Sequence, residues 1–457
     1  MQEKNRISSR LLLTALTVVI SFVLFLQVEG KEPDWNKVES EIVQLLQRLI
    51  QVDTQNPPGN ELAACRVLKS FFDREGIGNE IYKVDETRAN FIARLHGNGS
   101  KEAVLLAAHT DVVPFDEDEW SVPPLSGTLQ DGFIYGRGAL DDKGRLAVHA
   151  MTIALLKRHN VPLRRDIILL ATAGEETGGS AGAGWMLERH RKELDAAFAL
   201  NEGGRIISMD GKLLYVGIQT EEKAAYNVSL IVSGTTGHAS VPRIDNAINS
   251  AAKAIERIAR YSSPRILDPV TAAFFSVISK KDQRVRLVDG VLKTENPLYL
   301  ALMTNTISPT LIQGGVKTNV HPPEVTINLN CRLLPGQDVG TFVDTLRSWV
   351  GPGPYQFKCS SRSKSHNPSS QEGIGYMLVE QVCREMFPGV SIVPYLSAGM
   401  SDATRLRAEG IPTYGLLPFP LDEDEVRRMH GKDERISVEA LMTGMKLVYR
   451  IAVLAGK

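Results

Sequence analysis

The stretch Ile167-Ile168-Leu169-Leu170-Ala171-Thr172-Ala173-Gly174-Glu175-Glu176-Thr177-Gly178-Gly179 decides the fold of this 457-residue chain. An apolar run that ends in two adjacent acidic residues and a glycine-rich turn is typical of a buried strand that carries polar side chains to the edge of a sheet. Two carboxylates at such a place are costly when buried unless cations or hydrogen-bond donors accompany them. The stretch therefore indicates a metal or catalytic site, with a solvated pair of charges as the plain alternative.

Four other segments repeat this arrangement, in which an apolar or β-rich run is followed closely by a metal-binding side chain. In chain order the five side chains are His109, Asp141, Glu176, Glu202 and His430. Short β-rich runs that alternate with helical stretches predict an α/β fold, with a mixed, largely parallel sheet flanked by helices and ligands gathered where the strands end. Taken alone, His109 could be a core histidine and Asp141 a helix-capping aspartate.

The chemistry of this set favours zinc, with cobalt or manganese as alternatives, because the ligands are oxygen and nitrogen atoms without a thiolate. Five ligands, one of them a carboxylate able to bridge, exceed what one tetrahedral zinc needs, so two metal ions are expected. Asp111 follows His109 on the same side of an extended segment and is expected to orient its imidazole. A metal ion explains one of the adjacent residues Glu175 and Glu176, and the other can then serve as the general base.

Length and composition describe an ordinary globular enzyme. A chain of 457 residues exceeds what one core usually serves, which favours two domains. A hydrophobic share of 43%, a charged share of 23% and a formal net charge of −1 argue against nucleic acid as the main partner. The four cysteines form no CxxC pair and are interpreted as free core residues, with one disulfide as the alternative.

The N-terminal segment, residues 1–30, has the pattern of an export signal. Lys4, Arg6 and Arg10 precede an uncharged apolar stretch over residues 11–26, and Val28 and Gly30 suit a cleavage site. The apolar stretch is slightly short of a bilayer span, so a cleaved signal peptide and a retained membrane anchor both remain open. Either way we expect an exported protein, whether secreted, periplasmic or held at the membrane.

The pattern of predicted elements divides the rest of the chain. A catalytic domain is expected over residues 31–219 and 365–457, beginning with an amphipathic helix over residues 38–50 and closing with a helix over 437–455. Residues 220–364 form a candidate second domain between the last two metal ligands. Its expected elements are a strand at 226–232, a helix at 246–261, a strand at 324–333 and a helix at 339–350.

Six motifs carry a resemblance to a known family. They are His-Thr-Asp-Val-Val-Pro at 109–114, Gly-Arg-Gly-Ala-Leu-Asp-Asp-Lys-Gly at 136–144, Ala-Gly-Glu-Glu-Thr-Gly-Gly at 173–179, Asn-Glu-Gly-Gly at 201–204, Gly-His-Ala-Ser at 237–240 and His-Gly-Lys-Asp-Glu-Arg-Ile at 430–436. In this order they resemble the dinuclear zinc peptidase family of carboxypeptidase G, succinyl-diaminopimelate desuccinylase, aminoacylase and carboxypeptidase S. The resemblance covers nearly all of the chain after residue 30. It implies a zinc exopeptidase-like catalytic domain with an inserted α+β lid of ferredoxin-like topology.

The resemblance also assigns roles to the metal ligands. Asp141 would bridge two zinc ions, with His109 and Glu202 on one ion and Glu176 and His430 on the other. Asp111 would orient His109, and Glu175 would be the general base. One residue departs from the pattern: family members nearest to carboxypeptidase S tend to have aspartate where this chain has Asn201. This departure leaves room for a weaker or differently coordinated metal at Glu202.

The same resemblance implies roles for three residues of the lid. His238 would stabilise the oxyanion at a reaction centre, usually that of a partner subunit. Asn319 and Arg332 would hold a substrate carboxylate, although surface roles for both are an alternative. A homodimer is therefore expected, and an enlarged lid that serves its own subunit is the other possibility.

The function that follows is metal-dependent hydrolysis of an amide bond next to a free carboxylate. Small peptides with a C-terminal residue and N-acyl amino acids both qualify as substrates. A serine hydrolase using Ser401 is the competing enzyme class, because Gly399-Met400-Ser401-Asp402-Ala403 approximates a nucleophile elbow, with Asp422 and His430 following. That interpretation lacks the second glycine and leaves Glu175 unexplained. A non-enzymatic metal-binding role is the third alternative.

Overall fold

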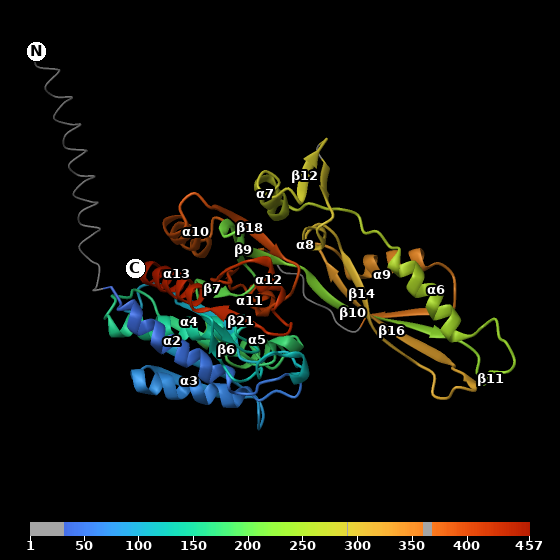
Figure 1. Cartoon of the computed structure of the whole chain (residues 1–457), viewed down its shortest axis with the longest axis horizontal. Helices are drawn as coiled ribbons and strands as arrows, with labels where there is room; N and C mark the ends of the chain where they lie inside the picture. The colour runs from blue at the N-terminus through green and yellow to red at the C-terminus, as the bar shows by residue number, and fades with distance from the viewer. Residues whose placement is uncertain (1–31, 290, 360–367) are drawn as a thin grey trace, which may run out of the picture.

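The computed structural model of the protein describes residues 32–289, 291–359 and 368–457 and shows an α/β body and an elongated lid (Figure 1). The predicted signal or anchor, residues 1–30, lies outside the described residues. In the part of the chain that is described, no helix combines the length and apolar character needed to cross a bilayer.

A ten-stranded sheet forms the centre of the body, in the order β1-β2-β6-β3-β7-β19-β9-β8-β20, with β18 beside β9. Strands β6, β3, β7 and β19 run parallel to one another, whereas β1, β2 and the β8–β9 hairpin add antiparallel pairs. The prediction of a mixed, largely parallel sheet is therefore confirmed. The strands are β1 (Gly78–Lys83), β2 (Ala89–Leu95), β3 (Val104–His109), β6 (Ile167–Thr172), β7 (Phe198–Asn201), β8 (Arg205–Met209), β9 (Lys212–Glu222), β18 (Ser391–Ser397), β19 (Thr413–Gly415) and β20 (Pro420–Leu421).

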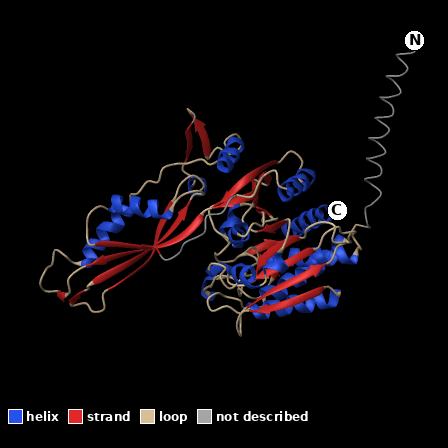
Figure 2. Cartoon of the chain, turned by 180° about the vertical axis from the view of Figure 1, so that it is seen from behind, coloured by secondary structure: helices blue, strands red, loops and turns tan. Residues whose placement is uncertain are grey.

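Both faces of this sheet are buried, which explains why its central strands are apolar throughout. Leu106 on β3 packs into the main core, and its neighbour Leu105 packs into a smaller core on the opposite face. Helices α2, α3, α4, α10 and α13 supply the main core, while α5 and α11 cover the other face (Figure 2). The helices are α2 (Trp35–Ile50), α3 (Glu61–Glu75), α4 (Lys143–Arg158), α5 (Ala183–Arg189), α10 (Ile374–Met386), α11 (Asp402–Ala408), α12 (Glu423–Arg427) and α13 (Val438–Gly456).

A small antiparallel sheet positions the last predicted metal ligand. It consists of β4 (Leu129–Gln130), β5 (Phe133–Tyr135) and β21 (Arg435–Ser437), in the order β21-β5-β4. Because β21 pairs with β5, the segment that contains His430 is held beside the loop that leads to Asp141. Two motifs that lie almost 300 residues apart in the chain thus meet at one end of the large sheet.

The lid is a four-stranded antiparallel sheet in the order β14-β16-β10-β17, with α6 and α9 packed on one face. Chain order β10-α6-β14-β16-α9-β17 is the ferredoxin-like pattern that the sequence resemblance implied. Val228, Leu230, Ile327, Leu329 and Phe342 lie at the centre of its core. The elements are β10 (Ala224–Ser233), β11 (Gly237–His238), α6 (Ala247–Ala259), β14 (Thr306–Gly314), β15 (Val320–His321), β16 (Glu324–Leu333), α9 (Val339–Val350) and β17 (Tyr355–Cys359).

One segment within residues 220–364 packs against the body and not against the lid sheet. It comprises α7 (Pro269–Ile278), the hairpin β12 (Val285–Val288) and β13 (Val291–Thr294), and α8 (Pro297–Ala301). Phe274, Phe275 and Tyr299 form an aromatic cluster with Tyr215 of β9 and Tyr395 of β18. This insertion explains why the block is longer than a simple ferredoxin-like unit.

Candidate metal centre

Asp141 stands between two histidines that come from opposite ends of the sequence. Its Oδ1 lies 2.9 Å from His109 Nε2, and its Oδ2 lies 3.1 Å from His430 Nε2. Each carboxylate oxygen therefore faces a different imidazole, which is the geometry that a bridging ligand needs. Glu176 Oε1 lies 3.0 Å from His430 Nε2, whereas Glu202 Oε1 lies 3.9 Å from His109 Nε2. The structure thus sorts the five side chains into two sets that share Asp141.

His109 is oriented by the residues that follow it. It ends β3, and its Nδ1 lies 2.9 Å from the backbone carbonyl oxygen of Asp111, with the Asp111 carboxylate at 3.6 Å. An Nδ1–H that donates to this carbonyl leaves the Nε2 lone pair free toward Asp141 and a metal ion. Burial disfavours the imidazolium, but the Asp111 and Asp141 carboxylates outweigh it and raise the pKa of His109 well above its usual value.

Asp111 also fixes the turn that carries the two adjacent glutamates. This turn is the 3-10 helix η2 (Glu175–Thr177), and Gly174 and Gly178 flank it with φ of 66° and 97°. Glycine adopts this left-handed conformation without steric cost, which accounts for the glycines of the motif. The Asp111 carboxylate accepts the N–H of Glu175 at 3.1 Å and of Glu176 at 3.2 Å. A single aspartate therefore connects the histidine strand to the glutamate turn.

Glu202 follows β7, and the two glycines after it allow the chain to pack tightly. Gly203 has φ of 107°, and a Cβ there would lie 2.2 Å from Gln219 Nε2. A Cβ at Gly204 would lie 2.1 Å from a backbone carbonyl oxygen of β19. Any larger residue at either position would displace the backbone that presents Glu202 to the site.

Two supporting residues escaped the sequence analysis. Glu434 is fully buried and accepts the backbone N–H of Leu140 at 2.8 Å and of Asp141 at 3.1 Å, so it shapes the loop that presents the bridging carboxylate. Asn56 donates to the Asp111 carboxylate at 3.0 Å. The sequence pointed to both positions, because Glu434 lies inside the 430–436 motif and Asn56 directly precedes a Pro-Pro-Gly turn. Neither position identifies a contact partner without the tertiary structure.

The electrostatics of the cluster favour a cation. Burial, and then the Glu202 carboxylate, raise the pKa of Glu175 well above its usual value. Burial, and then Asp141, do the same for Glu202. The site gathers more carboxylates than its own cationic groups balance, and ligand atoms of His109, Glu175 and Glu202 lie within 4.8 Å of one another. Divalent ions fit this donor set, because they would relieve the repulsion between the carboxylates.

His430 occupies a strained position. Its φ of 61° places a non-glycine residue in the left-handed region, and its side chain is half exposed. The Asp141 and Glu176 carboxylates raise the pKa of His430 to about 10. Backbone strain of this kind is concentrated at functional sites, where the surrounding structure enforces it.

Ser401 is not placed as a nucleophile. Its hydroxyl accepts from Asn201 Nδ2 at 3.1 Å, donates to Glu222 and caps the N-terminus of α11. Among the described residues no histidine hydrogen-bonds to Ser401, and His430 faces Asp141 and Glu176 instead. The serine-hydrolase alternative is therefore wrong. Asn201, which directly precedes Glu202, donates to Ser401, and Ser401 in turn donates to the buried Glu222. An aspartate carboxylate at position 201 could not donate this hydrogen bond.

The three predicted lid residues are not brought together. Arg332 lies at the body end of β16, where burial lowers its pKa and the Glu175 carboxylate opposes that shift. His238 belongs to β11, which lies at the end of the lid farthest from the body (Figure 1). Asn319 is beside it, since its carbonyl oxygen accepts the N–H of Ala239 at 3.0 Å. The charge of Arg332 is therefore within electrostatic reach of Glu175, while its Nε donates to Asn330 at 3.0 Å, and His238 and Asn319 lie at the far end of the lid.

Comparison with known proteins places this site in a family. Residues 105–453 match the family described as Peptidase family M20/M25/M40. The N-fatty-acyl-amino acid synthase/hydrolase PM20D1 of Homo sapiens is 30% identical over 370 residues, covering 77% of this chain and 74% of that protein. A probable succinyl-diaminopimelate desuccinylase of Staphylococcus aureus is 33% identical over 313 residues, covering 66% of this chain and 70% of that protein.

Solved structures share the fold. An M20 family metallo-carboxypeptidase from Sulfolobus solfataricus superposes with a TM-score of 0.71 at 19% identity, covering 91% of this chain and 99% of that one. Human carnosine dipeptidase 1 gives a TM-score of 0.69 at 16% identity, covering 92% of this chain and 97% of that one. The chain therefore belongs to peptidase family M20/M25/M40 and is a hydrolase of the metallopeptidase and amidohydrolase type.

Proposed function

We propose that the protein uses two zinc ions to hydrolyse an amide bond next to a free carboxylate, with N-acyl amino acids as the preferred substrate class and small peptides as the second. The observation that carries this proposal is the position of Asp141, whose two oxygens face His109 and His430 separately. The relatives whose names refer to N-acyl-amino acid and succinyl-diaminopimelate hydrolysis support the substrate class. Cobalt or manganese would suit the same ligands.

The residues divide the work as follows. His109, Asp141 and Glu202 would hold one ion, and Asp141, Glu176 and His430 the other. Zinc bound there would polarise the scissile carbonyl and lower the pKa of the attacking water. Glu175 accepts a proton from that water and returns it to the amide nitrogen as the C–N bond breaks. Burial raises the pKa of Glu175, which suits a group that must hold the proton between the two steps.

We assign Arg332 to the substrate carboxylate within one chain, because its charge is within electrostatic reach of Glu175. A guanidinium can bind a carboxylate through two parallel hydrogen bonds. We assign His238 to the oxyanion and Asn319 to the substrate, both acting from a second subunit, because both lie at the outer end of the lid. Action in cis would require the lid to fold back over the body.

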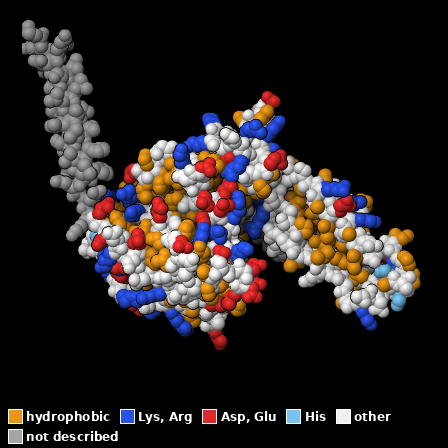
Figure 3. Space-filling model, in the orientation of Figure 1, with side chains coloured by type: hydrophobic (Ala, Val, Ile, Leu, Met, Phe, Trp, Pro, Cys, Tyr) orange, Lys and Arg blue, Asp and Glu red, His pale blue; other side chains and the backbone are white. Residues whose placement is uncertain are grey.

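A homodimer follows from this assignment. Strand β14 is an edge of the lid sheet, and Leu311 and Ile312 on it are 58% and 60% exposed. Figure 3 shows hydrophobic side chains gathered over the lid. An exposed apolar edge strand is a ready site for pairing with a second chain. Sedimentation velocity of the purified protein will measure the oligomeric state, and a monomer at working concentration contradicts the homodimer.

The activity is tested by metal analysis and a substrate screen. The purified protein should contain close to two transition-metal ions per chain, and chelation should abolish hydrolysis of N-acyl amino acids and dipeptides, with recovery on adding zinc. Activity that survives complete removal of metal contradicts the proposal. We also propose export on the basis of residues 1–30, and fractionation of the host cell with N-terminal sequencing will distinguish cleavage from anchoring.

A further inference from the structure

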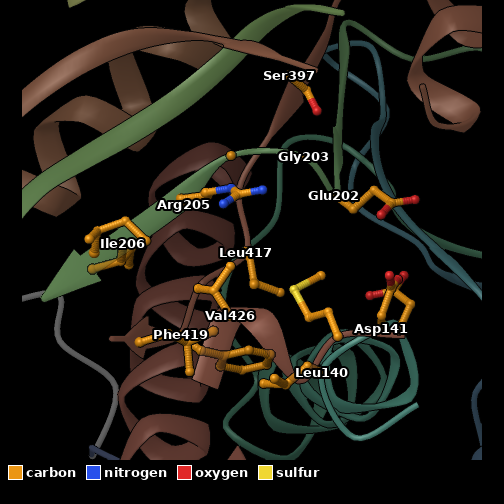
Figure 4. A pocket seen from close by; sticks show the side chains of 15 residues that line it. Leu140, Asp141, Glu202, Gly203, Arg205, Ile206, Ser397, Leu417, Phe419 and Val426 are labelled. Atoms are coloured by element: carbon orange, nitrogen blue, oxygen red, sulfur yellow. The ribbon is translucent and has the colours of Figure 1, made fainter. Parts of the chain in front are cut away.

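Two cavities lie at opposite edges of the large sheet. The smaller, of about 100 Å³, belongs to the metal centre, where Asp141, Glu202 and Arg205 line it (Figure 4). The larger, of about 610 Å³, is an open cavity lined mainly by the loops that precede β3, β6 and β7. Its volume is within the range of pockets that bind small molecules. Nothing in the metal centre or the lid accounts for it.

The direction of the strands places the larger cavity far from the metal cluster. Lys101 and Glu102 precede β3, Arg165 precedes β6 and Ala197 precedes β7, whereas the metal ligands lie at the other ends of the same strands. These three strands run parallel to one another. A strand of six residues spans roughly 20 Å. A ligand in the larger cavity therefore does not reach the amide bond that the metal centre would hydrolyse.

Arg165 brings an unpaired charge to this cavity. The residue is only 3% exposed, and its Nε and Nη1 have no hydrogen-bond partner among the described residues. The adjacent Asp166 is already held by Arg94 and His96. Burial lowers the pKa of Arg165, as expected for a guanidinium enclosed without an acceptor. An anion at the remaining nitrogen, Nη2, would supply the missing counter-charge.

Two more cations lie close to Arg165, and one carboxylate opposes them. Lys101 lines the cavity and uses one of its three donors on the backbone oxygen of Lys457, at 3.1 Å. Partial burial, and then Arg164 and Arg165, lower the pKa of Lys101, so the three cations are close enough to repel one another. Glu102 also lines the cavity, but no ion pair joins it to Arg165 within the described ranges. The balance of charge favours an anionic ligand.

A phosphate group suits this arrangement better than a carboxylate does. It carries about −1.5 to −2 charges near neutral pH and has three acceptor oxygens, so it can meet Arg165 and Lys101 from different directions. Ala197 and Ile374, the first residue of α10, add an apolar part to the cavity. An organic group attached to the phosphate can pack there through the hydrophobic effect.

We propose that the larger cavity binds a small phosphate ester, with Arg165 and Lys101 as the counter-charges of its phosphate. This site is separate from the metal centre and does not depend on the proposed function. A soluble phosphate ester and the head group of a phospholipid share the required chemistry, and the experiment below distinguishes them.

The test is calorimetric titration of the zinc-loaded protein with glycerol 3-phosphate. We expect a binding event that Arg165→Met weakens at least ~10-fold, because a charge-assisted hydrogen bond is lost. Glu102→Gln should tighten the same event by about a few-fold, since it removes the opposing carboxylate. Any contact of the probe with the metal ions is common to these variants, because the cavity lies at the other edge of the sheet.

Arg66→Met is the matched control. Arg66 is exposed on α3 and does not line the cavity, so this variant loses the same charge and should bind the probe as the unmodified protein does. Without phosphate, Arg165→Met should melt no lower than the unmodified protein, because methionine removes an unpaired buried charge and keeps an apolar stem. If Arg165→Met fails to fold, Lys101→Met replaces it, with binding expected to be about a few-fold weaker.

Vesicles identify the source of the phosphate. Cosedimentation with phosphatidylglycerol vesicles that Arg165→Met abolishes would assign the head group of a lipid. Binding of glycerol 3-phosphate without cosedimentation would assign a soluble ester. Equal affinity for the probe in Arg165→Met and Arg66→Met overturns the proposal, and so does the absence of binding to both glycerol 3-phosphate and vesicles in the unmodified protein.

Discussion

The metal cluster and the lid differ in how their functional residues are held. In the cluster, each carboxylate or imidazole is fixed by contacts from at least one other segment, as Asp141 is by His109, His430 and Glu434. In the lid, the charge of Arg332 is within electrostatic reach of Glu175, whereas His238 is exposed at the opposite end, where its imidazole hydrogen-bonds to Ser240. The shared edge of the large sheet brings the residues of the metal cluster together. No contact among the described residues of one chain brings His238 to that cluster.

The two regions bring residues to a reaction centre in different ways. Residues at the ends of neighbouring parallel strands are brought together by the sheet itself, so their roles can be argued from one chain. Residues on a separate domain reach a reaction centre only through domain closure or assembly. Substitutions in the body should therefore act within one chain, whereas the effect of a lid substitution depends on closure or assembly.

The largest effect is expected at the bridging ligand. Asp141→Ala should remove the contact shared by both histidines and lower affinity for both ions, with at least a ~10³-fold loss of activity. His430→Ala should lose mainly one ion, because it faces Glu176 and Asp141 but not Glu202. Elemental analysis of the purified variants measures this. Two retained ions in Asp141→Ala would contradict the bridge.

The general base should show nearly as large an effect with a different signature. Glu175→Gln keeps the shape of the side chain and should retain both ions and the fold, while turnover falls at least ~10²-fold. Glu188→Gln, exposed on α5, is the matched control and should leave turnover unchanged. Near-normal turnover in metal-replete Glu175→Gln would contradict the assignment of Glu175 as the general base.

The lid should affect turnover without affecting metal. His238→Ala is expected to lower kcat about 10²-fold, the usual cost of losing one oxyanion donor. Mixing this variant with Glu175→Gln should restore part of the activity, because one hybrid site then contains both groups. Monomers in solution together with no recovery on mixing would show that the lid acts within its own chain.

A smaller effect is expected from the residue that departs from the family pattern. Asn201→Asp replaces the amide that donates to Ser401 and adds a negative charge near Glu222. We expect a few-fold tighter binding of the metal held by Glu202, because a negative charge added beside the site attracts a cation. Titration of the metal-free variant with zinc will measure it, and unchanged affinity would show that Asn201 has no positioning role.

The smallest effect concerns the pH dependence of stability at Glu221, which lies near the end of β9, just before the lid strand β10. Burial, and then Asp268, raise the pKa of Glu221 to about 7 from 4.5. A carboxyl group with a raised folded pKa stabilises the protein fully below the unfolded value and loses this effect as pH rises through 7. Thermal stability should therefore fall between about pH 5 and pH 8. Glu221→Gln should lessen this fall by about 2 °C, and calorimetry at both pH values checks it.

Local patterns were sufficient for several helices and strands, although they did not predict β14, β17 or the segment from α7 to α8. The helix predicted over residues 339–350 has those same bounds as α9, and the strand predicted at 324–333 is β16. The predicted strand at 226–232 is the centre of β10. These segments have strong periodicity or apolar runs, and both signals arise from neighbouring residues along the chain.

The sequence by itself indicated the central strands, several of the helices, the five candidate metal-binding side chains and the family, because each is encoded in short stretches with their own physical signature. Only the tertiary structure decided that Asp141 lies between the two histidines, that Glu434 shapes its loop and that the segment from α7 to α8 packs on the body. It alone also separated Arg332 from His238 and placed Arg205 beside Glu202. Such contacts join residues far apart in the chain, so no local pattern specifies them.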